Sequence, residues 1–254
     1  MRPENTEDTI YGIHAVEELL KQRLQDVERV YFTADIASSP LFSLLKLCRK
    51  ERLAYQSVPA NKLDMLAGTT KHQGVVAVCS AKSYTSVETL LAALAEKSTP
   101  PLLYVPASIE DPRNLGSLIR TCVAFGVDAM LLERKNTTLL GATVAKTSAG
   151  MLEHLPIVKP KNLEGLLNDL IAQGYSVVGA QEGGASTPEE IDFTKPTVIV
   201  SGGEHRDIPP YLGKLCTAIA GIPIHQTAQS LNVSVAGAIL LYECDRQRRA
   251  TTAP

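Results

Sequence analysis

The stretch Ile109-Glu-Asp-Pro-Arg-Asn-Leu-Gly-Ser-Leu-Ile-Arg-Thr-Cys122 decides the architecture of the larger part of the chain. It follows the apolar run Leu102–Val105, which predicts a buried strand. Asp111 and Pro112 predict an N-cap and a first helical position, so a helix is expected over 112–125. A strand that leads directly into a helix places the start of that helix at the carboxyl end of the sheet, where α/β folds bind ligands.

Strands and helices alternate downstream of this stretch. The apolar pattern predicts strands at 129–132, 155–158, 176–180, 197–201 and 217–220, and helices at 139–148, 163–173 and 230–248. Strands this apolar, separated by helices, indicate an α/β fold with a mainly parallel sheet and helices on both faces.

A smaller α/β unit is predicted upstream. Apolar residues recur at helical spacing near 13–20 and 41–48, a short helix is expected near 61–67, and strands are expected at 29–33, 53–58 and 74–80. Thr85-Ser-Val-Glu88 has the pattern of a capping box that opens the next helix. We therefore predict a small domain over 1–83, a linker with the first helix of the next domain over 84–100, and a larger domain over 101–254.

Composition narrows the class of protein. The 254 residues include 25 Lys+Arg and 27 Asp+Glu, for a formal net charge of −2, and 44% are hydrophobic, which excludes wholesale disorder. No apolar run is long enough to span a membrane, and no apolar segment of a signal peptide stands at the start, so a cytoplasmic protein is expected. The five Cys and five His are scattered, which favours reduced, packed thiols and no metal site.

Two later segments also place polar residues where strands are predicted to end. In the first, Thr197-Val-Ile-Val-Ser runs into Gly202-Gly203 and Glu204, which predicts a tight turn with exposed backbone N–H groups. In the second, Ile222-Pro-Ile224 is followed by a polar loop and by Ser230-Leu-Asn-Val-Ser234, with Ser230 as the expected N-cap of the last helix. Dinucleotide-binding, P-loop, zincin and α/β-hydrolase motifs are absent from the sequence.

The order and spacing of these three segments resemble the SpoU-type 2′-O-ribose RNA methyltransferases of the SPOUT superfamily. The resemblance rests on Asn114-x-Gly-x-x-x-Arg120, on the strand–glycine–Glu204 turn and on Ile222-Pro-Ile…Ser230-Leu-Asn-Val-Ser-Val-Ala236. It extends to Tyr11-Gly-Ile-His-Ala-Val-Glu17 and His72-Gln-Gly-Val-Val-Ala77, which are similar to the small substrate-binding domain of the branch that modifies a guanosine in 23S ribosomal RNA. It implies a deep trefoil knot, a homodimer with active sites at its interface, and S-adenosylmethionine as the methyl donor.

The resemblance also implies roles for individual residues. Arg120 would be the catalytic residue, acting as a general base or as a positioning cation, with Asn114, Glu204, Ser230 and Asn232 around the substrate nucleotide. The cofactor would be bound by Gly202, Gly203, Ile222, Ile224 and Leu231. The chain departs from the pattern at His205-Arg-Asp207, where the family usually has glycines, and near His225, where a loop glycine is missing.

Alternatives remain open at the level of sequence. Transfer RNA is a second possible substrate, and a knotted RNA-binding protein without catalysis is compatible with the lost glycines. Because the net charge is close to zero, RNA binding would depend on local basic surfaces and would have a modest salt dependence. The candidates are Lys46, Arg49 and Lys50 on one predicted helix face, Arg113 with Arg120, and the group Arg246, Arg248 and Arg249.

Overall fold

The helix predicted after the Leu102–Val105 strand is present in the computed structural model, which describes residues 9–22, 24–34, 39–80, 82–203 and 207–252. Helix α5 spans Pro112–Ala124, and its N-cap Asp111 accepts a hydrogen bond from the backbone N–H of Arg113 at 2.8 Å. The preceding strand β5 spans Leu102–Pro106 and is fully buried. The predicted strand, cap and helix are therefore confirmed.

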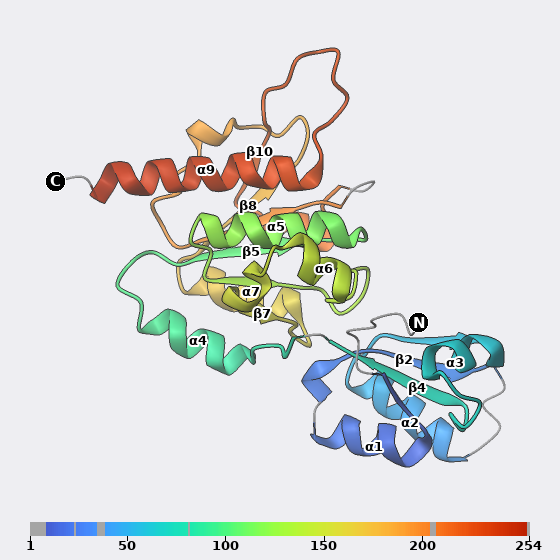
Figure 1. Cartoon of the computed structure of the whole chain (residues 1–254). Helices are drawn as coiled ribbons and strands as arrows, with labels where there is room; N and C mark the ends of the chain where they lie inside the picture. The colour runs from blue at the N-terminus through green and yellow to red at the C-terminus, as the bar shows by residue number, and fades with distance from the viewer. Residues whose placement is uncertain (1–8, 23, 35–38, 81, 204–206, 253–254) are drawn as a thin grey trace. The chain divides into compact units, whose positions relative to one another are not determined.

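The chain folds into two compact units (Figure 1). One contains the described residues up to Tyr84 together with Leu139–Ala142, and the other contains the remaining described residues.

The first unit is built on a four-stranded sheet in the order β1-β4-β2-β3. The strands are β1 (Thr9–Tyr11), β2 (Val27–Thr33), β3 (Tyr55–Val58) and β4 (Val75–Cys79), and only β2 and β3 pair in parallel. Helices α1 (Ile13–Gln22) and α2 (Ser39–Lys50) pack their apolar residues on one face of the sheet, and α3 (Ala60–Ala67) packs Leu63 on the other. A single 3-10 turn, η1 (Leu24–Asp26), precedes β2.

The second unit is built on a six-stranded sheet in the order β10-β8-β9-β5-β6-β7, and all of its strand pairs are parallel. The strands other than β5 are β6 (Ala129–Leu131), β7 (Ile157–Val158), β8 (Ser176–Ala180), β9 (Thr197–Ser201) and β10 (Ala218–Ala220). The chain proceeds from β5 outward to β7 and then continues on the other side of β5. The order therefore reverses between β5 and β9, and such a switch point is where open α/β sheets bind ligands.

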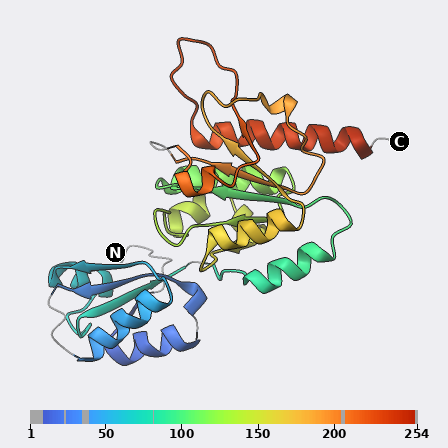
Figure 2. The ribbon, with the colours of Figure 1, turned by 180° about the vertical axis from the view of Figure 1, so that it is seen from behind.

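Helices cover both faces of this sheet, as predicted. One face is covered by α4 (Val87–Ala95), α7 (Leu163–Ala172) and α8 (Pro210–Gly213). In the reverse view of Figure 2, α7 is the yellow helix. Helices α5 and α9 (Val233–Thr252) lie side by side on the other face, where a Cβ at Gly237 would lie 2.7 Å from Leu118. The shorter elements are α6 (Ala142–Thr147) and the 3-10 turns η2 (Met151–His154) and η3 (Pro188–Glu190).

Three predicted helix starts are wrong. The N-cap of α4 is Ser86, whose Oγ accepts from the backbone N–H of Thr89 at 3.1 Å, because Thr85 already pairs with the sheet beside Val158. Helix α6 begins at Ala142, three residues later than expected. Helix α9 begins at Val233, so Ser230 is not its cap.

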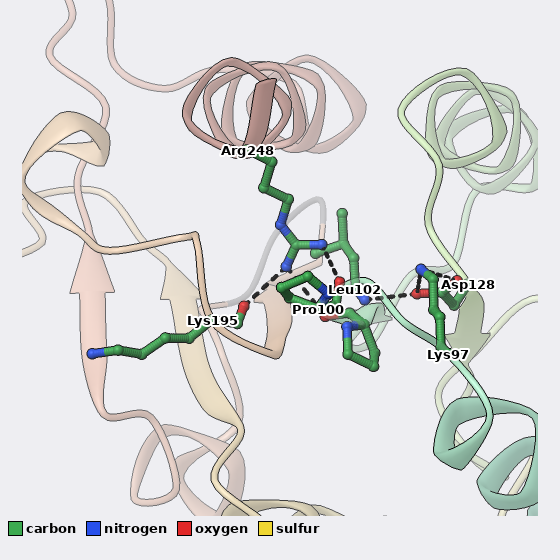
Figure 3. Close-up of polar contacts among 7 residues, drawn as sticks. Lys97, Pro100, Leu102, Asp128, Lys195 and Arg248 are labelled. Atoms are coloured by element: carbon green, nitrogen blue, oxygen red, sulfur yellow. Dashed lines mark hydrogen bonds and ion pairs between the residues drawn. The ribbon is translucent and has the colours of Figure 1, made fainter. Parts of the chain in front are cut away.

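The carboxyl-terminal part of α9 is fixed to the amino ends of the strands through Arg248 (Figure 3). The Arg248 guanidinium donates to the carbonyl oxygens of Phe193 at 2.9 Å, Pro100 at 2.6 Å, Pro101 at 3.2 Å and Lys195 at 3.0 Å. The donors of Arg248 are thus used inside this unit, and its contribution to the predicted basic surface with Arg246 and Arg249 stays a prediction.

Asp128 makes a second set of contacts at the same end of the sheet (Figure 3). Lys97 Nζ donates to both carboxylate oxygens of Asp128, at 2.6 and 2.7 Å, and Asp128 also accepts from the backbone N–H of Leu102 at 2.8 Å. These contacts join the segment before β5 to the start of β6.

All five cysteines are free thiols, and four of them are buried. Burial raises the pKa of Cys48 to about 12 and that of Cys216 to about 11, so both thiols stay protonated. No helix among the described residues combines the length and apolarity needed to cross a membrane.

Candidate active site

A cleft of about 690 Å³ opens at the carboxyl ends of the second sheet, a volume typical of small-molecule sites. Its walls come from the loop after β5, from the ends of β8, β9 and β10, and from the start of α9. The lining residues are Glu110, Asp111, Ala180, Gln181, Glu182, Ser201, Gly202, Gly203, Asp207, Ala220, Ile222, Ile224, Ser230, Leu231, Asn232, Val233 and Ala236. The cleft therefore lies at the switch point between β5 and β9.

Two glycine contacts let the loops of the cleft approach one another closely. A Cβ on Gly203 would lie 2.4 Å from the carbonyl oxygen of Ser108, so no side chain fits there without a backbone shift. A Cβ on Gly184 would lie 2.4 Å from the backbone nitrogen of Gly221, which brings the loops after β8 and β10 into backbone contact. Of these glycines Gly203 lines the cleft, which is bounded by main chain there.

The lining combines apolar and acidic groups. Among the described residues, Ile222, Ile224, Leu231, Val233 and Ala236 contribute apolar lining, and Glu110, Asp111, Glu182 and Asp207 contribute acidic lining. A ligand with an apolar body and a positive charge matches such a lining better than an anion does.

The first and third sequence segments meet through two asparagines beside the cleft. Asn232 Nδ2 donates to Asn114 Oδ1 at 3.0 Å and thereby joins the start of α9 to the first turn of α5. Asn232 Oδ1 accepts from the backbone N–H of Ser234 at 2.9 Å and from its hydroxyl at 2.6 Å. One side chain therefore caps α9 and links the two helices.

A buried carboxylate supports the loop on the β5 side of the cleft. Glu133 is 8% exposed, and its Oε2 accepts from the backbone N–H of Ser108 at 2.8 Å. Ser108 has a φ of 54°, a left-handed conformation that is uncommon for a residue with a side chain. Glu133 also accepts a short hydrogen bond from the Tyr211 hydroxyl, and burial together with this carboxylate raises the pKa of Tyr211. Glu133 thus holds the backbone that packs against Gly203.

Several predicted site residues line the cleft. Of the proposed cofactor residues, Gly202, Gly203, Ile222, Ile224 and Leu231 all do so, together with Ser230 and Asn232 from the proposed nucleotide-binding set.

Other predicted residues lie elsewhere. Asn114 touches the site through Asn232, whereas Arg113 and Arg120 are exposed on α5 and do not line the cleft. Arg120 follows Asn114 by six positions, which places it about 9 Å further along the helix axis. Glu204 and the residues His205 and Arg206 lie outside the described part of the chain.

The sequence reading did not single out the β8 side of the cleft. Gln181 and Glu182 follow a buried strand and precede Gly183-Gly184, a pattern that also marks the turn after β9. Polar residues and glycines that follow an apolar strand indicate a candidate site, and this rule also selects Gln181 and Glu182. Glu133 gave no such signal, because its partners are distant in sequence.

Two protein-family models match the chain. Residues 101–242 match the model described as SpoU rRNA Methylase family. Residues 9–85 match the model described as RNA 2'-O ribose methyltransferase substrate binding.

Similar proteins cover nearly the whole chain. "Putative TrmH family tRNA/rRNA methyltransferase YacO" of Bacillus subtilis (strain 168) is 31% identical over 241 residues, which are 95% of this chain and 96% of that protein. The crystal structure of the SpoU methyltransferase AviRb from Streptomyces viridochromogenes, in complex with the cofactor AdoMet, has a TM-score of 0.58 at 23% identity and covers 96% of this chain and 92% of that one. An rRNA methyltransferase from Sinorhizobium meliloti gives a TM-score of 0.56 at 22% identity, with coverage of 96% and 89%. At these identities, the two structures show a shared fold.

Proposed function

The chain belongs to the SpoU rRNA methylase family, and on that basis we propose that it transfers a methyl group from S-adenosylmethionine to the ribose 2′-hydroxyl of a guanosine in 23S ribosomal RNA. Membership makes it an RNA methyltransferase of the SpoU/TrmH type, while the ribosomal substrate and the nucleotide are our proposal. The observation that carries the proposal is the cleft at the β5–β9 switch point, which the Asn232–Asn114 hydrogen bond joins to α5.

The cleft fits the proposed cofactor in size and in charge. S-adenosylmethionine supplies a methyl group on a positively charged sulfur and also carries an ammonium group. The carboxylates of Glu110, Asp111, Glu182 and Asp207 provide negative charge for these cations, and the apolar side of the cleft suits an adenine ring. The backbone of Gly202 and Gly203 can approach such a ligand closely because neither residue carries a side chain.

The polar residues beside the cleft would hold the RNA. Asn114 and Asn232 fix one another, so their remaining donors and acceptors are preoriented for a nucleotide. Arg120 carries a guanidinium, whose planar fork of donors binds phosphate well, so we assign it to positioning and charge stabilisation. Ser230 and Glu204 complete the proposed nucleotide-binding set.

We also propose a homodimer in which Arg120 serves a site at the subunit interface. Val235, Ile239 and Tyr242 share one face of α9 and are 46%, 37% and 53% exposed. Tyr242 also packs in a T-shaped arrangement against Phe125, the C-cap residue of α5, with ring centroids 6.2 Å apart. A row of exposed apolar side chains next to the helix of Arg120 suits a second copy of the chain.

The domain assignment follows the two family matches. We propose that residues 1–83 bind the RNA substrate, with Arg113 on the larger domain contributing, that 84–100 form the linker and the first helix of the catalytic domain, and that 101–254 form a knotted methyltransferase domain acting in the cytoplasm.

Methyl transfer to separated RNA fractions tests the function. Purified protein is incubated with methyl-labelled S-adenosylmethionine and with ribosomal RNA, ribosomal particles or transfer RNA from a strain that lacks the gene. Incorporation into one 2′-O-methylguanosine of 23S RNA supports the proposal, incorporation only into transfer RNA changes the substrate, and none with any RNA refutes it.

Calorimetry separates the roles of cofactor binding and catalysis. Arg120→Ala should abolish transfer but leave S-adenosylmethionine affinity within about twofold, because Arg120 does not line the cleft. Normal turnover of this variant would refute the role of Arg120. Undetectable cofactor binding by the unaltered protein would favour an RNA-binding protein that has lost catalysis.

The oligomeric state is tested by light scattering. The double variant Val235→Arg/Ile239→Arg should be a monomer without activity, whereas Ala250→Arg, an exposed position on the same helix, should remain a dimer. Unaltered protein that runs as a monomer at micromolar concentration would refute the proposed dimer.

A further inference from the structure

Two exposed aromatic rings on the first unit are each paired with a cation. On α2, Lys46 Nζ lies 4.9 Å from the centroid of the Phe42 ring. At the end of the same helix, Arg49 Cζ lies 5.8 Å from the centroid of the Tyr55 ring on β3, and Arg49 Nε donates to the Tyr55 hydroxyl at 3.1 Å. Phe42 is 48% exposed and Tyr55 is 39% exposed. We call these four residues, together with Lys50, the α2–β3 patch.

The patch is laid out along one helix face and the edge of the sheet. Positions 42, 46, 49 and 50 recur at the spacing of one side of a helix, and the opposite side of α2 packs Leu41, Leu44, Leu45 and Cys48 into the core. Because β3 is the edge strand beside β2, Tyr55 stands at the border of the sheet. Neither ring is needed to fill the core, and both remain accessible.

The charge of the segment favours an anionic partner. Residues 39–55 contain Lys46, Arg49, Lys50 and Arg52 but only one acidic residue, Glu51, in a chain whose overall charge is slightly negative. Positive charge alone would attract any polyanion. Exposed rings add a preference for a polyanion that carries aromatic groups, and unpaired RNA bases stack on aromatic side chains and guanidinium planes.

We propose that the α2–β3 patch binds unpaired nucleotides of the RNA substrate by stacking bases on Phe42 and Tyr55 and pairing phosphates with Lys46, Arg49 and Lys50. This inference deepens the proposed function and rests on RNA being the substrate. Phe42 and Arg49 are seven residues apart, about 10 Å along the helix axis. One strand of a duplex advances only about 3.4 Å per nucleotide, so two cation–ring pairs placed this far apart along α2 suit an extended, unstacked strand.

Oligonucleotide binding without cofactor tests the stacking. Fluorescence anisotropy is measured with a short unstructured oligouridylate and with an RNA duplex of equal length. Tyr55→Ala and Phe42→Ala should each weaken binding of the single strand about tenfold, the loss expected for one base–aromatic stack, and should leave duplex binding unchanged. Tyr55→Phe should retain the affinity, because it keeps the ring and loses only the hydroxyl.

Salt dependence separates stacking from charge. Lys50→Ala should weaken binding of the single strand and lower the slope of log affinity against log salt by about 0.7, whereas Tyr55→Ala should leave the slope unchanged. Met65→Ala is the matched control, since Met65 is an exposed apolar residue of the same unit at 75% exposure. Far-ultraviolet circular dichroism checks that each variant is folded.

The binding assay tests the α2–β3 patch, and the methylation assay tests the proposed function. If Tyr55→Ala and Phe42→Ala bind the single strand as tightly as the unaltered protein, or lose duplex binding equally, the patch is refuted whatever the methylation assay gives. If the aromatic variants lose single-strand binding but the unaltered protein methylates no RNA, the patch is retained and the proposed function is refuted.

Discussion

Replacing Arg248 by Ala removes four hydrogen bonds that fix α9 to the segments before β5 and β9. The guanidinium donates to the carbonyl oxygens of Phe193, Pro100, Pro101 and Lys195. Ala keeps the helix, because it has the highest helix propensity, and adds no new contact. The substitution therefore measures what the guanidinium contributes to the second unit.

The expected loss in the free energy of unfolding depends on how exposed each hydrogen bond is. The bonds to Pro100 and Lys195 are exposed, so water can replace the guanidinium there, whereas those to Phe193 and Pro101 are partly buried. A hydrogen bond with a charged partner contributes about 1.5–3 kcal/mol net. Counting the two partly buried bonds at the lower value gives about 3 kcal/mol, which lowers Tm by roughly 6–12 °C for a chain of this size.

Thermal unfolding followed by circular dichroism measures the loss, and hydrogen exchange at the amides of β5 and α9 assigns it to the second unit. Arg249→Ala is the matched control on the same helix. Arg249 Nε pairs with Asp245 at 2.8 Å on the surface, and an exposed pair of this spacing contributes only about 0.3–0.5 kcal/mol. Arg248→Lys should fall between the two, because Lys keeps the charge without the fork of donors.

The reasoning is refuted if Arg248→Ala unfolds within 2 °C of Arg249→Ala, a margin of roughly 0.5 kcal/mol at this chain length. That result would mean that water satisfies all four carbonyl groups as well as the guanidinium does.

Three further predictions concern the cleft and the thiols. Gly203→Ala should weaken S-adenosylmethionine binding at least tenfold by calorimetry, because its Cβ would collide with the backbone of Ser108. The control Gly213→Ala, which has open space around it, should bind the cofactor normally, and equal affinities of the two variants would contradict the packing argument. Glu133→Ala should lower cofactor affinity about fivefold or more, although Glu133 does not line the cleft, because the hydrogen bond to Ser108 is lost. Tyr211→Phe should have a smaller effect, because it leaves that bond in place, and unchanged affinity in Glu133→Ala would exclude the supporting role of Glu133. Burial and raised pKa values should keep the thiols nearly unreactive toward a disulfide reagent at pH 8 until the protein is unfolded, and rapid labelling of the native protein would oppose this expectation.

The predictable part of the fold was local. Asp111 and Pro112 fixed the start of α5 because a cap and its helix lie within a few residues of each other. The alternation of apolar strands with helices was enough to predict the parallel sheet. The start of α9 is predicted three residues too early, because Ser230 and Asn232 are both residue types that cap helices, whereas the bonds from Ser234 and to Asn114 are made by Asn232.

The parts of the site that could not be predicted depend on distant partners. The Asn232–Asn114 bond joins residues 118 positions apart, and Tyr211 meets Glu133 across 78 positions. For Arg248, distant partners changed the interpretation of a local charge pattern. Its place in a basic cluster suggested a nucleic-acid surface, but carbonyl groups from two remote loops use its donors.

The central position of β9 has a consequence for how the chain folds. β9 pairs with β8 on one side and β5 on the other, and its register with β5 joins Leu102 to Thr197. Until β9 has been synthesised, β8 has no strand partner in the described sheet and β5 exposes one unpaired apolar edge. Pairings of such sequence separation form slowly, and unpaired edges invite association with other chains. We therefore expect refolding of the second unit to be slow and its yield to fall with protein concentration, so that a chaperone present during synthesis raises the amount of soluble enzyme.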